Sequence, residues 1–194
     1  MKRFFTLAFW AFVFIAKGQN TIEWDGIYQL QLSDFQSPAT QIGGVTIYSL
    51  HSAASFDFSF SMTSGEFMFT KNFNPKVNCT FRRDAASLVA PDSIFANDLL
   101  GFARYEFDLA ELYARKFRKR LYEEKDAFSD ASFFQPIYDS VQMEFARRHT
   151  LAGKMTDVGR NGEKLQELHQ EVLNEIQLLP DFCKMCKPSK KKKE

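Results

Sequence analysis

A long helix with one continuous apolar face dominates this 194-residue sequence. Asp92 or Ser93 can cap its start, and the helical pattern continues to about Glu124. Apolar residues recur there at spacings of three and four and form one stripe: Ala96, Leu100, Ala103, Phe107, Ala110, Ala114, Phe117 and Leu121. Most of the stability of such a helix comes from packing of its apolar face, so other elements have to cover it.

The segment before this helix has the period-two alternation of β-strands. Strands are predicted at Ile27–Leu32, Val45–Leu50, Phe56–Met62, Phe67–Thr70 and Val77–Phe81. Ser64 and Gly65 predict a hairpin turn between two of these runs. One face of that hairpin is expected to pack on the helices through Phe56, Phe58, Phe60, Phe67 and Phe69.

The segment after the long helix is helical as well. Pro136 suits a first helical turn and opens a helix that is predicted to continue to about Leu151. Asn161 can cap a third helix, which Pro180 ends. Strands followed by helices indicate an α+β fold. We therefore predict an N-terminal antiparallel β-rich half followed by three helices, in a single domain over residues 19–182.

The first 18 residues have the features of a signal peptide. Lys2 and Arg3 precede an apolar run, Thr6–Ala16, that is short for a membrane span. Small residues at Ala16 and Gly18 predict cleavage before residue 19. An uncleaved N-terminal anchor is the alternative. We expect an exported protein, periplasmic or extracellular, without a transmembrane segment after cleavage.

Charge divides the chain into an acidic body and a basic tail. Residues 19–182 hold 16 basic and 23 acidic side chains, a net charge of −7, whereas residues 183–194 hold six lysines and one glutamate, a net charge of +5. This distribution excludes a nucleic-acid-binding domain. The tail is expected to be disordered. Lys190–Lys193 either contacts an anionic lipid or an acidic partner, or acts as a solubilising terminus.

Three cysteines are present, at Cys79, Cys183 and Cys186. Export would expose them to an oxidising compartment, so a disulfide is expected. Cys183 and Cys186 can pair with each other, or one of them can pair with Cys79. A single Cys-x-x-Cys pair supplies only two of the four ligands of a structural zinc site, which disfavours zinc there.

Charged residues on the long helix also form local pairs. Glu111 with Arg115, and Arg104 with Asp108, are spaced as i,i+4 pairs of an exposed helix. Arg115–Arg120 forms a basic patch that is either a solvated helix end or a contact for an anionic surface.

The same helix resembles the signature of a known family. Eleven residues match it: Leu99, Leu100, Phe107, Asp108, Ala110, Glu111, Tyr113, Ala114, Arg115, Lys116 and Arg118. The family is a bacterial group of secreted domains of unknown function described as zinc-dependent proteases. Its helix reads Leu-Leu-x-His-Glu-Gln-Gly-His-Phe-Asp-Ile-Ala-Glu-x-Tyr-Ala-Arg-Lys-Leu-Arg. Leu32–Phe35 and Thr156–Asn161 resemble two further family segments.

The resemblance implies a metallopeptidase-like fold, but the zinc-site positions hold other residues. In the family pattern two histidines one turn apart bind zinc, and the adjacent glutamate is the general base. Those positions here are Phe102, Glu106 and Ala103, and a downstream histidine position is Val158. Phenylalanine and valine have no lone pair for a metal, and alanine cannot take a proton. We therefore expect no metal site, no cofactor and no catalytic residues, although zinc is the family's cofactor.

Three functional hypotheses follow. The first is an exported, non-catalytic metallopeptidase-like protein that binds a peptide, a glycan or an envelope protein. The second is a hydrolase with a rearranged site, in which Glu106 acts with distant carboxylates or with His149. The third is a structural protein whose cleft is filled by Phe102 and Val158.

Overall fold

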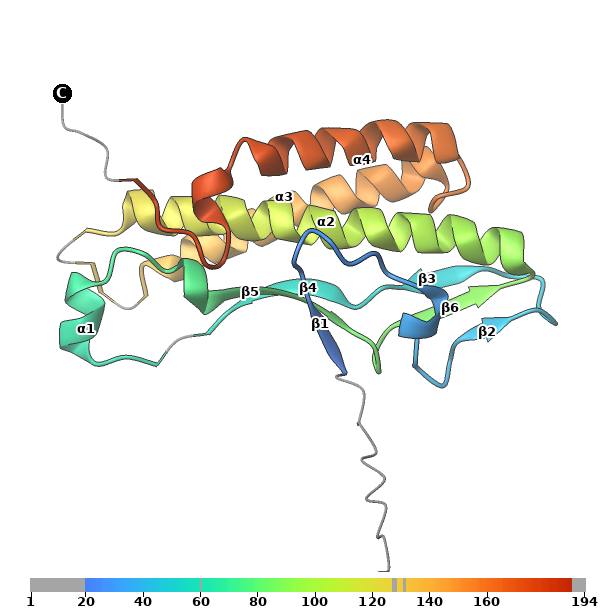
Figure 1. Ribbon diagram of the computed structural model, residues 1–194, viewed down its shortest axis with the longest axis horizontal. Helices are drawn as coiled ribbons and strands as arrows, with labels where there is room; N and C mark the ends of the chain where they lie inside the picture. The colour runs from blue at the N-terminus through green and yellow to red at the C-terminus, as the bar shows by residue number, and fades with distance from the viewer. Residues whose placement is uncertain (1–19, 60, 127–128, 131, 190–194) are drawn as a thin grey trace, which may run out of the picture.

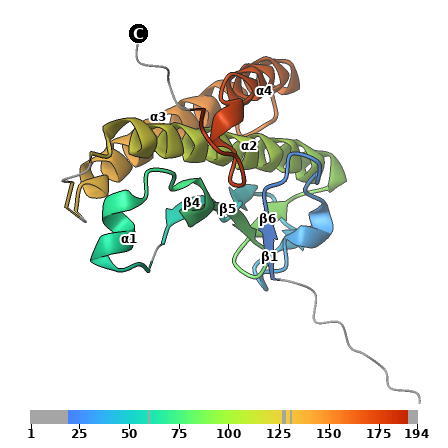
Figure 2. The same ribbon diagram turned by 60° about the vertical axis from the view of Figure 1, so that its left-hand side comes forward.

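The computed structural model describes residues 20–59, 61–126, 129–130 and 132–189. The predicted signal peptide over residues 1–18 and the lysine run 190–193 lie outside these ranges. Two layers make up the fold, one of helices and one of small sheets (Figure 1). Helix α2 lies between the strands and the other two long helices (Figure 2). The long helices are α2 (Ser93–Glu124), α3 (Phe134–Thr156) and α4 (Gly162–Gln177).

Two three-stranded sheets form the second layer. The first has the order β1-β5-β4 and is antiparallel, with β1 (Thr21–Glu23), β5 (Val77–Arg82) and β4 (Ala54–Phe58). The second has the order β2-β6-β3 and is mixed, with β2 (Gln41–Ile42), β6 (Ser87–Ala90) and β3 (Ser49–His51). The predicted α+β class is confirmed, with small antiparallel and mixed sheets and three long helices.

The helix ends follow the predicted caps closely. The carboxylate of Asp92 accepts hydrogen bonds from the first backbone N–H groups of α2, those of Ile94 and Phe95. Pro136 lies in the first turn of α3, which continues to Thr156, five residues beyond the predicted end. Asn161 caps α4 by accepting from the N–H of Lys164.

Several of the predicted strands are wrong or shifted. Ile27–Leu32 is not a strand, because the Asp25 carboxylate accepts two backbone N–H groups and bends the chain into a turn. Ser64–Phe69 is helix α1 and not a hairpin, since Thr63 and Glu66 form a capping box there. Val45–Leu50 forms a strand only at its end, in β3. Val77–Phe81 is confirmed as β5.

Phenylalanines from β4 fasten the sheet to the helices. Phe56 and Phe58 lie two residues apart on one face, and both rings contact Phe117 of α2, with centroids 6.5 and 5.5 Å away. Phe67 is buried as well. Phe69 does not pack as predicted, because it lies on the outer face of α1 and is 87% exposed. Phe60 lies outside the described residues.

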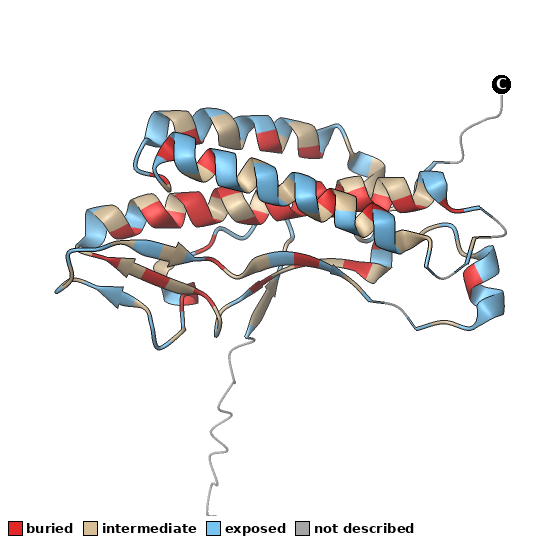
Figure 3. Cartoon of the chain, turned by 180° about the vertical axis from the view of Figure 1, so that it is seen from behind, coloured by how far each residue is buried: buried red, intermediate tan, exposed pale blue. Residues whose placement is uncertain are grey.

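Helix α2 is enclosed over most of its length, and its two ends are exposed (Figure 3). Its buried residues are not confined to one stripe, because the sheets cover one side while α3 and α4 cover the other. Ionisable residues are among them: Glu111, Arg115 and Arg118 are 2%, 8% and 1% exposed. The predicted i,i+4 pair of Glu111 with Arg115 is present, but it is buried and not exposed. The predicted basic patch is solvated only in part, because Arg115 and Arg118 are buried while its other three basic residues are partly exposed.

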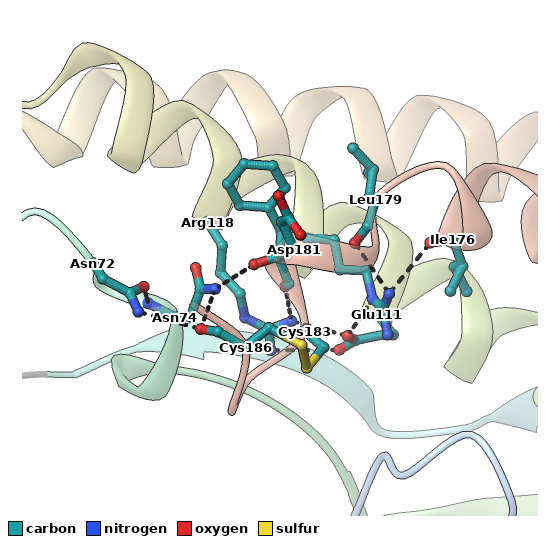
Figure 4. The surroundings of a disulfide bond; sticks show 11 residues. Asn72, Asn74, Glu111, Arg118, Ile176, Leu179, Asp181, Cys183 and Cys186 are labelled. Carbon is teal, nitrogen blue, oxygen red and sulfur yellow. Dashed lines mark hydrogen bonds and ion pairs between the residues drawn. A yellow bond between two sulfur atoms is a disulfide. The ribbon is translucent and has the colours of Figure 1, made fainter. Parts of the chain in front are cut away.

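These three charges form one buried cluster beneath the C-terminal segment (Figure 4). One oxygen of Glu111 accepts from Arg115 and from Arg118, each at 2.9 Å. Arg118 also donates to the carbonyls of Val77 and Phe182. Each charge therefore has a partner in the interior, and α2 is joined to β5 and to the end of the chain.

The C-terminal segment is folded back over this cluster. Cys183 and Cys186 form a disulfide, and Cys79 is left as a free buried thiol. The carbonyl of Cys186 accepts from the side-chain amides of Asn72 and Asn74. The first residues of the predicted disordered tail, 183–194, therefore contact the body, whereas its last five residues lie outside the described ranges.

We predict that Glu111→Gln lowers the free energy of unfolding by about 3–5 kcal/mol, because it leaves two buried arginines without their counter-ion. Denaturant unfolding followed by circular dichroism measures the change. Glu124→Gln is the matched control: Glu124 is paired with Arg120 in an exposed i,i+4 pair, and its loss should cost no more than about 0.5 kcal/mol. Equal losses in the two variants would contradict the role given to the cluster.

Candidate functional site

Two of the positions that correspond to catalytic residues of the resembled family lie in the interior of this protein. Phe102 and Ala103 are 2% and 0% exposed. The Phe102 ring lies 5.6 Å from the rings of Tyr105 and His149, between centroids. A side chain on Gly153 of α3 would begin 3.6 Å from the tip of the Phe102 ring. The space that an imidazole and a metal would need is therefore filled by hydrocarbon.

The turn between α3 and α4 closes this region from the end. Asp157, Val158 and Gly159 all have positive φ, at 49°, 53° and 102°. A Cβ on Gly159 would lie 2.2 Å from the carbonyl oxygen of Asp98 in α2, so only glycine fits there. Val158 is partly buried against the core. The turn brings Val158 to the same end of α2 as Phe102, and the valine side chain has no atom that could bind a metal.

Glu106 is the one polar residue among the family positions, and it is paired. Its carboxylate lies 3.4 Å from Nε2 of His149 on α3, and the two side chains are 14% and 36% exposed. The imidazole of His149 stacks on Phe145, with centroids 6.0 Å apart. The hydrogen bond to Glu106 raises the pKa of His149, against the burial that lowers it. The structure thus brings together the two residues of the hydrolase hypothesis.

A second carboxylate–imidazole pair lies on another side of α2. Asp108 accepts from Nε2 of His169 on α4 at 2.6 Å and from Nε1 of Trp24 at 2.7 Å. The predicted pair of Arg104 with Asp108 is replaced, because Arg104 donates through Nε to the carbonyl of Leu30. Sequence analysis missed the Asp108–His169 pair, since the two residues are 61 positions apart and no spacing rule joins them.

A groove adjoins this second pair. It has a volume of about 320 Å³ and lies between α2, α4 and the loop that carries Gln29. Polar residues in its lining include Arg104, Gln166, His169 and Gln170. A larger hollow of about 480 Å³ lies beside β1 and is lined in part by Trp24. Trp24, Asp108 and His169 thus connect two concave surfaces, whereas Phe102 and Ala103 line neither.

The residues at the family positions do not fit zinc. Phe102, Ala103 and Val158 offer no ligand atom, and Glu106 with His149 makes at most two ligands where a catalytic zinc site needs three. Within the described ranges, no three His, Cys, Asp or Glu side chains are grouped as a metal site. Cys79 is also a poor metal ligand, because burial raises the pKa of its thiol and so disfavours the thiolate that binds metals.

Comparison with protein-family models, with curated proteins and with solved structures finds no match for this chain. The family resemblance therefore depends on the residues of α2 and of the two short segments beside it. In the part of the chain that the structure describes, no helix combines the length and apolar character that a membrane span requires.

We predict that Glu106→Gln lowers the pKa of His149, because the carboxylate that favours the protonated imidazole is gone. The raised pKa in the folded state means that the pair stabilises the fold below the ordinary histidine pKa of 6.5, and that this contribution disappears as pH rises through the raised value. The loss of unfolding free energy in Glu106→Gln should therefore be larger at about pH 5.5 than at about pH 8.5.

Proton NMR of the His149 ring, titrated in both proteins, measures this shift directly. Glu163→Gln, at an exposed position in the first turn of α4, is the control and should leave the His149 titration unchanged. An unaltered midpoint in Glu106→Gln would show that the carboxylate does not act on the imidazole.

Proposed function

We propose that this protein is an exported, non-catalytic metallopeptidase-like protein with a binding or structural role in the cell envelope. One observation carries the proposal: the positions that correspond to the first zinc ligand and to the general base of the resembled family, Phe102 and Ala103, are enclosed in the core. Export is proposed from the N-terminal residues of the sequence.

Metal-assisted hydrolysis needs an open coordination position for water and a base beside it. Neither Phe102 nor Ala103 has an atom for these tasks, and the ring of Phe102 occupies the interior between α2 and α3. The remaining acid, Glu106, is engaged by His149. These contacts support a protein that keeps a protease-like helix as the centre of its core.

A binding role is supported by what stays accessible. The groove beside Asp108 and His169 has both polar and apolar walls and is open to solvent, and its volume is within the range of small-ligand sites. Its partner would be a peptide, a glycan or an envelope protein, and the acidic body disfavours nucleic acid.

The second candidate is a hydrolase that uses Glu106 and His149. The 3.4 Å pair favours it, because a carboxylate that orients an imidazole is the usual support for general acid–base catalysis. The ring neighbours of His149, however, are Phe102 and Phe145, and neither is a nucleophile. We therefore rank this candidate second.

Metal analysis and a protease assay on the same purified sample test the proposal. After incubation with zinc and dialysis, we expect less than one equivalent of bound zinc. We also expect no chelator-sensitive hydrolysis of casein. Zinc at one equivalent together with chelator-sensitive hydrolysis would overturn the proposal.

Glu106→Gln separates the two candidates in the same assay. Hydrolysis that is insensitive to chelator but lost in Glu106→Gln would support the rearranged hydrolase. Glu163→Gln, the exposed control, should leave any such rate unchanged.

A further inference from the structure

We propose that the groove between α2 and α4 binds an aliphatic carboxylate, a ligand with one carboxylate group and a short branched apolar chain. This inference depends on the proposed binding function and names the ligand class of its open site. The groove lies on the Asp108 side of α2, and neither Phe102 nor Ala103 lines it, because both are inside the core.

Arg104 supplies the recognition of the anion. Its Nε donates to the carbonyl of Leu30 at 2.9 Å, which fixes the guanidinium plane in the groove wall. Among the described residues, no acceptor is bonded to the two terminal nitrogens of Arg104. A planar guanidinium with two terminal N–H groups matches a carboxylate in a bidentate pair.

The charge of the groove favours an anion. Arginine and histidine are present in its lining, and none of its nine lining residues is Asp or Glu. Asp108 lies one turn beyond Arg104 on α2, but its two oxygens already accept from Trp24 and His169. A ligand carboxylate at Arg104 would therefore face a cation and not a free carboxylate of the groove.

Amide groups supply the remaining polar contacts. Gln166 and Gln170 are one turn apart on α4, and Gln29 lines the same groove from the loop that follows β1. The side-chain amides of Gln29 and Gln166 make no hydrogen bond within the described part of the chain. Primary amides both donate and accept, so they suit an acylamino group beside the carboxylate as well as the carboxylate itself.

Two leucines supply the apolar contact. Leu165 and Leu173 lie on the same face of α4 as His169 and line the groove at its two ends. Gly101 of α2 lies opposite Leu165, and a Cβ at Gly101 would lie 3.4 Å from the end of that leucine side chain. No aromatic ring other than the imidazole of His169 lines the groove, which disfavours sugars and nucleobases that stack on aromatic faces.

N-acetyl-leucine and N-acetyl-leucinamide are the probes, titrated into the ¹⁵N-labelled protein and followed by amide chemical shifts. We expect the acid to shift resonances of Gly101, Arg104 and α4, and to bind at least about tenfold more tightly than the neutral amide, because a charge-assisted bidentate pair is lost in the amide. Equal binding of acid and amide would overturn the proposal.

Arg104→Gln tests the residue, with Arg147→Gln on the exposed face of α3 as the matched control. We expect the affinity for N-acetyl-leucine to fall about tenfold or more in Arg104→Gln and to stay unchanged in Arg147→Gln. Gln166 is exposed, so Gln166→Ala should leave the helix folded, and this variant should also weaken binding. Unchanged affinity in both groove variants would overturn the proposal.

Acetyl-Ala-Ala-Leu distinguishes the two sources of such a carboxylate. Binding at least as tight as that of N-acetyl-leucine supports a peptide C-terminus, and weaker binding supports a small free acid. If none of the probes binds and the protein still lacks zinc and hydrolysis, the carboxylate inference fails while the non-catalytic proposal stands.

Discussion

The enclosure of α2 is the constraint on which the rest of this structure depends. Of its 32 residues, 17 are buried, more than a single apolar stripe provides. Sheets cover one side and two helices cover the other, so polar residues had to enter the interior with their partners. The carboxylate of Glu111, shared by Arg115 and Arg118, is the clearest case. It also ties the end of the chain to the middle of the fold, because Arg118 donates to the carbonyl of Phe182.

This enclosure has opposite effects on two sides of α2. On the side of α3, small and aromatic residues pack closely, and Phe102 and Ala103 belong to the core. On the side of α4 and the loop that follows β1, Asp108 accepts hydrogen bonds from two donors at the edge of an open groove. The first side of α2 therefore contributes packing to the core, whereas the second side leaves a groove accessible to solvent.

Local signals in the sequence predicted the helices well and the strands poorly. Asp92, Pro136 and Asn161 are cap or first-turn residues whose effect depends on neighbours a few positions away, so the sequence alone reveals it. The loop after Asp25 and helix α1 resemble strands in the sequence, because their apolar residues alternate. An Asx turn in the loop and a capping box at the start of α1 decide their actual structure.

The site depended on contacts that no local pattern encodes. The resemblance points to Glu106, but only the packing of α3 on α2 brings His149 to its carboxylate. The pairing of Asp108 with His169 needed the packing of α4 on α2, and the burial of Glu111 needed the C-terminal segment. In each case an element distant in sequence pairs with, or covers, a residue whose type suits an exposed helix.

Native-state hydrogen exchange of the backbone amides of Phe102, Ala103 and Glu106 tests the central claim most directly. If this face of α2 is closed core, these amides should exchange only with global unfolding, at the opening free energy that denaturant unfolding gives for the whole protein. Amides of the exposed helix α1 should exchange by local opening at a lower free energy. Exchange of the three α2 amides at that same low free energy would mean that the site opens in the native state, and would contradict the account.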